Sequence, residues 1–278
     1  NEEFMKDFDW LDDLKIRFGY GVTGNNDFSA TYMANMLGSD TNWMMPNGTW
    51  AYSYGKSQNV NPNLGWEEKK EWNLGVDYSF FEGRLYGKFD YYRREVDNLL
   101  FSVKVPQPPY TQGSQMQNIG SMESKGWEFE VGGDIIRTKD FTWSSSMNLS
   151  HNTGKILTLE GDNSYHNGNG FVAPGTPGDA ARMEAGSTIG SFYMWKFAGF
   201  DDEGSFLLYN KDGEVIPAAQ KTENDKQYIG NYTPKLIIGW SHTLTYKNFD
   251  LGINLRSWID FDVYNTINMY YGIQGQGN

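Results

Sequence analysis

The fold is decided by the stretch Leu14-Lys15-Ile16-Arg17-Phe18-Gly19-Tyr20-Gly21-Val22, in which apolar and polar residues alternate with a period of two. Side chains of a β-strand point alternately to its opposite faces. One face of this stretch therefore carries five apolar or aromatic side chains, while the other carries a lysine, an arginine and two glycines. The stretch predicts a strand that separates an apolar environment from a polar one.

The same alternation recurs in six further stretches, and long helical periodicities are absent, so the sequence predicts an all-β fold. None of the seven apolar faces contains Asp, Glu, Lys or Arg, whereas the polar faces together contain ten. The stretches approach or reach the length of about 9 to 11 residues that a tilted strand needs to cross a bilayer. The six further stretches are residues 72–80, 85–91, 127–135, 141–150, 236–246 and 249–258.

The connections between these stretches favour a membrane barrel over a soluble β-sandwich, in which a half-buried sheet also alternates. Short connections strictly alternate with long ones, as in membrane barrels with tight periplasmic turns and long extracellular loops. Aromatic residues gather beside the short connections, which fits an interfacial girdle; they are Trp10, Phe80, Phe81, Phe141, Trp143, Tyr246 and Phe249. The short connections are residues 82–83, 137–140 and 247–248, and the long ones are 23–65, 104–118 and 159–233.

Seven crossings cannot close an even-stranded barrel from a single chain, so residues 1–278 are expected to be one segment of a larger barrel. The same parity predicts that no part of the long extracellular loop at 159–233 crosses the membrane. Residues 192–200 and 206–209 are expected to form a β-hairpin inside this loop, because turn-forming residues follow each of them.

Composition excludes several other functions. A net charge of −12, from 23 Lys and Arg against 35 Asp and Glu, repels phosphate backbones, so no nucleic-acid partner is expected. The absence of Cys excludes thiol catalysis and Cys-ligated metals, and the three His lack metal-ligand spacing. Adjacent carboxylates such as Glu128 and Glu130 are explained by a polar barrel lining. We therefore predict no catalytic residue, no metal site and no enzymatic activity.

Two oxygen-rich segments, residues 201–204 and 210–214, bear a faint likeness to calcium-binding loops. Neither has the spacing of an EF-hand. The sequence therefore predicts no cofactor and leaves calcium open.

Several motifs resemble those of one protein family in order and spacing. Residues 12–25, DDLKIRFGYGVTGN, resemble the "DLKLRxSYGxTGN" strand of SusC/RagA-type TonB-linked outer-membrane transporters. Residues 61–67, NPNLGWE, are similar to the "NPxLxWE" segment of that family, and residues 118–128 to its "NIGxxxNKGxE" element. Residues 186–199 repeat its "GxxxGxFYxxxFxG" pattern.

This resemblance covers nearly the whole chain and corresponds to the later part of the barrel. It implies a transmembrane barrel of about 22 strands with a plugged lumen, with the plug domain, the TonB box and the final strands outside residues 1–278. It also implies a bacterial outer-membrane location, a SusD-like surface lipoprotein over the extracellular loops, and energy from TonB, which contacts parts of the protein outside this chain.

The activity that the resemblance implies is active import of nutrients, either glycans or oligopeptides, without chemistry on them. The alternative from another class is a non-transporting surface protein, such as an adhesin or a glycan-binding sandwich.

Two groups of residues are candidate functional sites. Aromatic side chains of the first long loop can bind sugar rings or peptide side chains, or can pack against other loops and the lipoprotein; they are Trp43, Trp50, Tyr52 and Tyr54. Charged residues on the polar faces are expected to face the lumen, where they line the passage or, in our preferred interpretation, contact the plug; they are Lys15, Arg17, Lys88, Asp90, Arg94, Glu128, Glu130 and Arg256.

Overall fold

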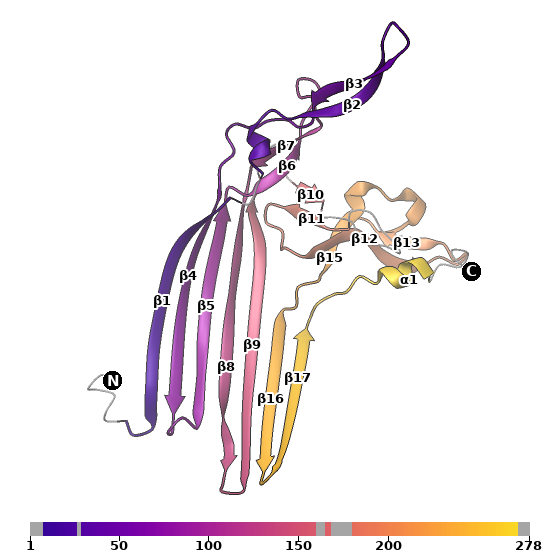
Figure 1. Cartoon of the computed structure of the whole chain (residues 1–278). Coiled ribbons are helices and arrows are strands. Elements are labelled where there is room, and N and C mark those ends of the chain that lie inside the picture. The colour runs from indigo at the N-terminus through magenta and orange to yellow at the C-terminus, as the bar shows by residue number, and fades with distance from the viewer. Residues whose placement is uncertain (1–7, 27–28, 160–164, 168–179, 272–278) are drawn as a thin grey trace.

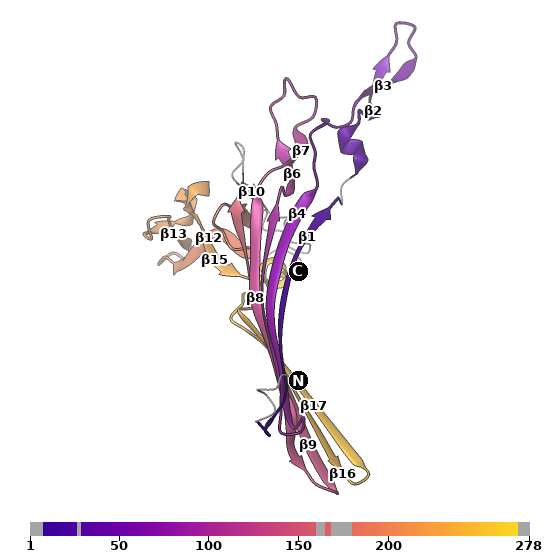
Figure 2. The same ribbon diagram turned by 90° about the vertical axis from the view of Figure 1, so that its left-hand side faces the viewer.

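A computed structural model describes residues 8–26, 29–159, 165–167 and 180–271. Two parts of the predicted 159–233 loop, residues 160–164 and 168–179, lie outside the described residues. Figures 1 and 2 show one tall, curved sheet with several smaller sheets gathered at its upper end. We call that upper end the loop end and the opposite end the short-turn end.

The tall sheet has seven antiparallel strands in the order β1-β4-β5-β8-β9-β16-β17. Each of the seven predicted stretches lies within one of them, which confirms the all-β prediction and the number of long strands. The strands are β1 Leu11–Asn25, β4 Glu67–Phe80, β5 Leu85–Asp97, β8 Ser121–Arg137, β9 Phe141–Thr158, β16 Leu236–Tyr246 and β17 Phe249–Ile259.

The other strands form smaller sheets at the loop end (Figure 1). Three are hairpin-like pairs: β2 Leu37–Met44 with β3 Trp50–Lys56, β6 Leu100–Lys104 with β7 Ser114–Asn118, and β10 Tyr165–Asn167 with β11 Arg182–Glu184. The fourth, which we call the loop sheet, has the order β14 Val215–Pro217, β13 Phe206–Tyr209, β12 Ser191–Phe200 and β15 Lys226–Asn231. The described helices are η2 Ala30–Met33, η3 Ala218–Gln220, η4 Glu223–Asp225 and α1 Thr266–Tyr271.

None of the helices in the described part of the chain is long and apolar enough to cross a membrane.

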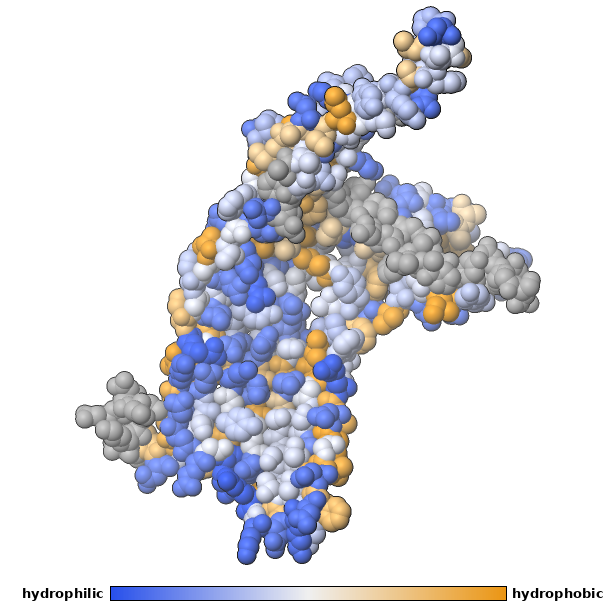
Figure 3. Space-filling view, in the orientation of Figure 1, coloured by the Kyte–Doolittle hydropathy of each residue, from blue (hydrophilic) through white to orange (hydrophobic). Residues whose placement is uncertain are grey.

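Within the part of the tall sheet nearer the short turns, the register places side chains of similar character side by side on each face. Figure 3 shows the face that we call the polar face, which is mostly hydrophilic. One row of directly opposed residues crosses it: Lys15, Asp77, Lys88, Glu130, Asn148, Gly239 and Arg256. The next row crosses the opposite side, which we call the apolar face: Ile16, Val76, Phe89, Phe129, Leu149, Ile238 and Ser257.

The apolar face is exposed, since none of the smaller described sheets covers it. Ile16 and Phe18 are each 71% exposed. The buried apolar side chains belong to the loop end, where the smaller sheets meet the tall one: Leu64, Leu99, Val103, Ile119, Ile156, Leu159, Ala180 and Phe192. A sandwich buries the inner faces of two sheets against each other. The exposed rows therefore contradict the sandwich alternative.

Aromatic side chains bound the apolar face at both ends. At the short-turn end, the ring of Phe80 lies 5.5 Å from that of Trp10 and 6.3 Å from that of Phe81. Toward the loop end, the rings of Trp72 and Tyr91 lie 5.4 Å apart. Amphipathic aromatic rings favour the interface between hydrocarbon and water. The two groups therefore mark the limits of an apolar band.

Above this band the same face becomes charged. Lys70 pairs with Asp97 at 2.9 Å, and Arg93 pairs with Glu123 at 2.6 Å. The strands thus continue beyond the apolar band into a region where both faces are polar. This change explains why several predicted stretches end earlier than the observed strands.

Five glycines on the polar face lie directly opposite a longer polar side chain of a neighbouring strand. A Cβ atom at any of them would come within 2.8 Å of an atom of that side chain. The long side chains therefore lie flat over the glycines instead of standing upright. The pairs are Gly19 with Asn73, Gly75 with Asp90, Gly126 with Tyr92, Gly132 with Tyr86, and Gly239 with Asn148.

Strand β9 extends past its neighbour β16 at the loop end, because their pairing ends at Ser150. Residues 186–189 cover the edge that remains. The N–H of Ile156 donates to Ser187 O at 3.0 Å, and the N–H of Ile189 donates to Gly154 O at 2.9 Å. Ile156 is only 1% exposed. The chain that follows β9 thus returns to close the edge of that strand.

The face assignment predicts different outcomes for two arginine substitutions in β16. Ile238→Arg places a charge on the apolar face, which is expected to lower the free energy of unfolding by about 2 to 4 kcal/mol near the middle of a bilayer. Ser241→Arg adds the same side chain to the polar face and is expected to change it by less than about 0.5 kcal/mol. Urea unfolding in lipid vesicles measures both, and equal losses would overturn the assignment.

Candidate functional site

Arg17 joins three strands on the polar face. Its Nε and Nη2 atoms donate to the two carboxylate oxygens of Asp77, each at 2.8 Å. Nη2 also donates to Asp90, at 2.9 and 3.1 Å. Bidentate hydrogen bonds between arginine and a carboxylate are geometrically specific as well as charge-assisted. One guanidinium therefore holds carboxylates from β4 and β5 to β1.

Gly75 makes this arrangement sterically feasible. It lies in β4 directly between Arg17 and Asp90, which occupy the opposed positions on either side of it. A Cβ atom at this position would lie 2.5 Å from Asp90 Oδ1 and 2.7 Å from Arg17 Cζ. Glycine is thus needed here for the close approach of two side chains across its backbone.

Two further groups of charges pair across strands. Lys88 of β5 lies 3.1 Å from Glu130 of β8. Nearer the loop end, Glu71 of β4 lies 3.0 Å from both Lys69 Nζ and Arg94 Nε. Arg94 Nε lies within ion-pair distance of the carboxylate but has no hydrogen-bond partner among the described residues.

Three of the predicted charged residues make no such contact. Lys15, Glu128 and Arg256 have no side-chain hydrogen bond or ion pair with any residue that the structure describes. Lys15 and Arg256 occupy the two ends of the charged row, on β1 and β17. The eight predicted residues thus divide into a paired group of five, namely Arg17, Lys88, Asp90, Arg94 and Glu130, and an unpaired group of three.

Sequence reasoning left three members of these networks, Lys69, Glu71 and Asp77, out of the candidate set. Asp77 alternates with the polar residues of its stretch, so its position was visible, but its pairing with Arg17 depends on the register between β1 and β4. Lys69 and Glu71 precede the predicted stretch at 72–80, which begins at the first residue of its apolar face, Trp72.

The four predicted loop aromatics lie on the β2–β3 hairpin, which projects beyond the rest of the chain (Figures 1 and 2). Their exposed fractions range from 66% to 72%. Trp50, Tyr52 and Tyr54 alternate along β3 and share one face of the hairpin. Trp43 is paired with Ala51 and therefore lies on the other face. The structure brings three of the four together and separates Trp43 from them.

A second exposed aromatic group, not predicted as a site, lies at the β12–β13 turn. The ring of Phe200 is 5.2 Å from that of Phe197 and 5.0 Å from that of Phe206. All three side chains are more than half exposed. Exposed apolar groups of this kind mark interaction surfaces.

The oxygen-rich turns of the loop sheet bind their own backbone. Asp201 Oδ1 accepts from the N–H groups of Glu203 and Ser205 at 3.1 and 2.6 Å. Asn210 Oδ1 accepts from those of Asp212 and Glu214 at 3.0 and 2.8 Å. Within the described ranges, no group of three or more His, Cys, Asp or Glu residues could hold a metal ion.

Two titratable groups of the loop end are perturbed by their surroundings. Burial, together with the hydrogen bond from the Tyr228 hydroxyl to Glu184 at 2.9 Å, raises the pKa of Tyr228 to about 12. The hydroxyl and N–H of Thr222 donate to Asp225 at 2.7 and 2.8 Å and lower the pKa of that carboxyl. This second contact stabilises the loop sheet at neutral pH and is lost as the pH falls through the lowered pKa.

The family model described as TonB dependent receptor-like, beta-barrel, matches residues 7–268. The chain is 33% identical over 275 residues to the TonB-dependent receptor SusC of Bacteroides thetaiotaomicron, covering 95% of this chain and 26% of that protein. It is 32% identical over 289 residues to the TonB-dependent receptor P3 of Formosa agariphila, covering 95% of this chain and 27% of that protein. The chain thus spans about a quarter of the length of these curated relatives.

Solved structures agree with these matches. The RagAB peptide transporter aligns with a TM-score of 0.75 at 26% identity, over 91% of this chain and 27% of the matched chain. The RagAB peptide importer in its open-open state aligns with a TM-score of 0.77 at 26% identity, over 93% and 27%.

The sheet, its exposed apolar face and these similarities lead to one conclusion. The tall sheet is part of a transmembrane β-barrel of the bacterial outer membrane. The chain belongs to the TonB-dependent receptor β-barrel family and is of the SusC/RagA type within it.

Proposed function

We propose that this chain forms part of the wall of a TonB-dependent active importer, which carries glycans or oligopeptides across the outer membrane. The observation that supports this most directly is the row of polar residues that crosses all seven strands, back to back with an exposed apolar row. Such a wall separates hydrocarbon from an aqueous interior. The proposal involves no cofactor and no chemistry on the substrate.

The paired and unpaired charges of the polar face are proposed to have different roles. Arg17 donates hydrogen bonds through Nε and Nη2 within the wall, where it joins β1, β4 and β5. Lys15, Glu128 and Arg256 make no side-chain hydrogen bond or ion pair with the described residues, which leaves their polar groups open to contacts with other parts of the protein. We assign these three to contacts with a plug or with the passing substrate.

The loop end is proposed to receive a SusD-like surface lipoprotein, and TonB to act through parts of the protein outside this chain. The three aromatic side chains on one face of the β2–β3 hairpin are exposed. The hairpin itself lies at the far upper end of the chain, away from the apolar band of the tall sheet (Figure 1). Aromatic residues are enriched at the buried centres of protein interfaces. They also stack on sugar rings and peptide side chains, so the same surface suits a captured nutrient.

The division of charges predicts opposite effects for two arginine-to-glutamine variants. Arg17→Gln removes the charge between two carboxylates and is expected to lower the free energy of unfolding, because Asp77 and Asp90 lose their shared cation. Arg256→Gln is expected to leave stability within about 0.5 kcal/mol but to slow uptake. Unfolding in vesicles and uptake by cells measure the two effects; a loss of stability in Arg256→Gln equal to that in Arg17→Gln would contradict the division.

The hairpin geometry predicts that aromatic residues on its two faces differ in importance. Replacing Trp50 and Tyr52 together with alanine removes the shared surface and is expected to reduce both lipoprotein co-purification and nutrient uptake about tenfold or more. Trp43→Ala alters the opposite face and serves as the control, with an expected change below about twofold. If Trp43→Ala is as damaging as the double variant, the shared face is not the functional surface.

The proposed function is tested directly by uptake into living cells. Cells with and without the gene are supplied with isotope-labelled oligopeptides in one experiment and labelled oligosaccharides in another. Gene-dependent accumulation of one class is expected, and a protonophore should abolish it, since TonB transmits energy from the inner membrane. Gene-dependent uptake of neither class, or uptake that persists without energy, would refute active import.

A further inference from the structure

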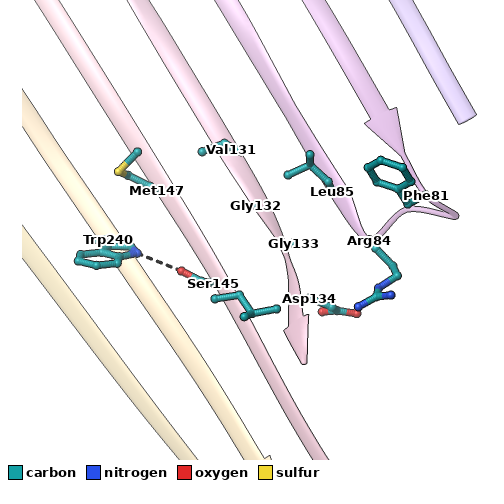
Figure 4. Close-up of a pocket in the computed structure, with 11 residues that line it drawn as sticks. Phe81, Arg84, Leu85, Val131, Gly132, Gly133, Asp134, Ser145, Met147 and Trp240 are labelled. Atoms are coloured by element: carbon teal, nitrogen blue, oxygen red, sulfur yellow. Dashed lines mark hydrogen bonds between the residues drawn. The ribbon is translucent and has the colours of Figure 1, made fainter. Parts of the chain in front are cut away.

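The apolar face of the tall sheet is interrupted by a hollow of about 490 Å³ near the short-turn end. Figure 4 views it from the side opposite to Figure 1, with the strand order reversed. Leu85 and Phe81 lie on one side of the hollow and Met147 and Trp240 on the other, with Val131 between them (Figure 4). The volume falls within the range of about 300 to 1,000 Å³ that is usual for small-molecule sites.

Two small residues at directly opposed positions create this hollow. Gly133 of β8 faces Ser145 of β9. A Cβ atom at Gly133 would lie 2.2 Å from the carbonyl oxygen of Arg84, so the close approach of β5 requires glycine there. The Ser145 hydroxyl accepts a hydrogen bond from Trp240 Nε1 at 3.0 Å, which fixes the indole ring at the border of the hollow (Figure 4).

The charges of the hollow are confined to the end nearest the short turns, where Arg84 and Asp134 line it. The Asp134 carboxylate already accepts from the Ser144 hydroxyl at 2.7 Å and lies 3.6 Å from Arg137. Arg84 makes no side-chain hydrogen bond or ion pair with any of the described residues. The Arg84 side chain points toward Asp134 (Figure 4), but that carboxylate is occupied by Ser144 and Arg137, and no ion pair forms between Arg84 and Asp134.

We propose that this hollow binds one phospholipid of the leaflet on the short-turn side. An acyl chain lies against Leu85, Val131 and Met147, and the phosphate accepts hydrogen bonds from Arg84. Two arguments support this occupant over a protein partner. The hollow opens onto the face that hydrocarbon surrounds, and Arg84, at its short-turn end, lies in the same turn as Phe81, a member of the aromatic group that marks the membrane interface. The site requires only the membrane orientation of the sheet and is independent of any transported nutrient.

Native mass spectrometry of the delipidated full-length receptor in detergent, titrated with palmitoyl-oleoyl phosphatidylglycerol, tests the acyl-chain contact. Val131→Phe fills the hollow with an apolar ring and is expected to weaken binding of the first phospholipid at least about fivefold. Val76→Phe makes the same change on the apolar face of β4, outside the hollow, and should bind as the wild type does. Equal affinities for the two variants would overturn the proposal.

The phosphate contact is tested with a second pair of variants. Arg84→Gln is expected to weaken phosphatidylglycerol binding about tenfold, as the loss of a charge-assisted hydrogen bond does, but to leave unchanged the binding of a diacylglycerol with the same chains. Lys247→Gln removes a cation from another short turn and should alter neither. An equal loss for both lipids would assign Arg84 a structural role and contradict the proposal. A crosslinking experiment from position 131 gives a further check: crosslinks to a second protein copy in place of lipid would also contradict the proposal.

Discussion

Within hydrocarbon, every backbone N–H and C=O group must find its partner in the protein, and the rest of this structure depends on that constraint. Between its seven strands the tall sheet meets it with hydrogen-bonded ladders that run without a shift through the apolar band, while the outer edges of β1 and β17 have no strand partner among the described residues. A slip of one residue in any of these pairings would turn a charged row toward lipid. The sheet does contain three register shifts, next to Leu11, Ser121 and Asp134. All three lie at or beyond the limits of the band, where the direction of a side chain matters less.

The polar face shows how the same register organises charges. Long polar side chains lie over the glycines of neighbouring strands, so they reach sideways along the wall rather than into the interior. Arg17 is the clearest case, because it crosses Gly75 to contact Asp90 while it also holds Asp77. Cross-strand contacts of this kind add stability to a sheet. They also leave the interior open for whatever the barrel contains.

Much of the fold could be predicted from the alternation of residues, and the failures have identifiable physical causes. The alternation located all seven long strands, because each has one apolar face. It missed their upper ends, where residues such as Lys70 and Arg93 make that face charged and the signal disappears. The candidate site was predictable only as a set of residues. Whether Arg17 contacts Asp77, or whether Trp43 joins Trp50, depends on which backbone positions oppose each other. That register arises from turn and bulge geometry, which a single sequence does not display.

The covered edge of β9 affects how a flexible peptide could bind to the sheet at this position. An exposed strand edge invites an extended peptide to join the sheet as an additional strand, whatever its side chains. Residues 186–189 already occupy that edge, through backbone hydrogen bonds to Gly154 and Ile156. Main-chain templating of a passing polypeptide is therefore blocked at this position. Any discrimination between peptides there must come from side-chain chemistry, and this edge is also closed to strand addition by unrelated chains.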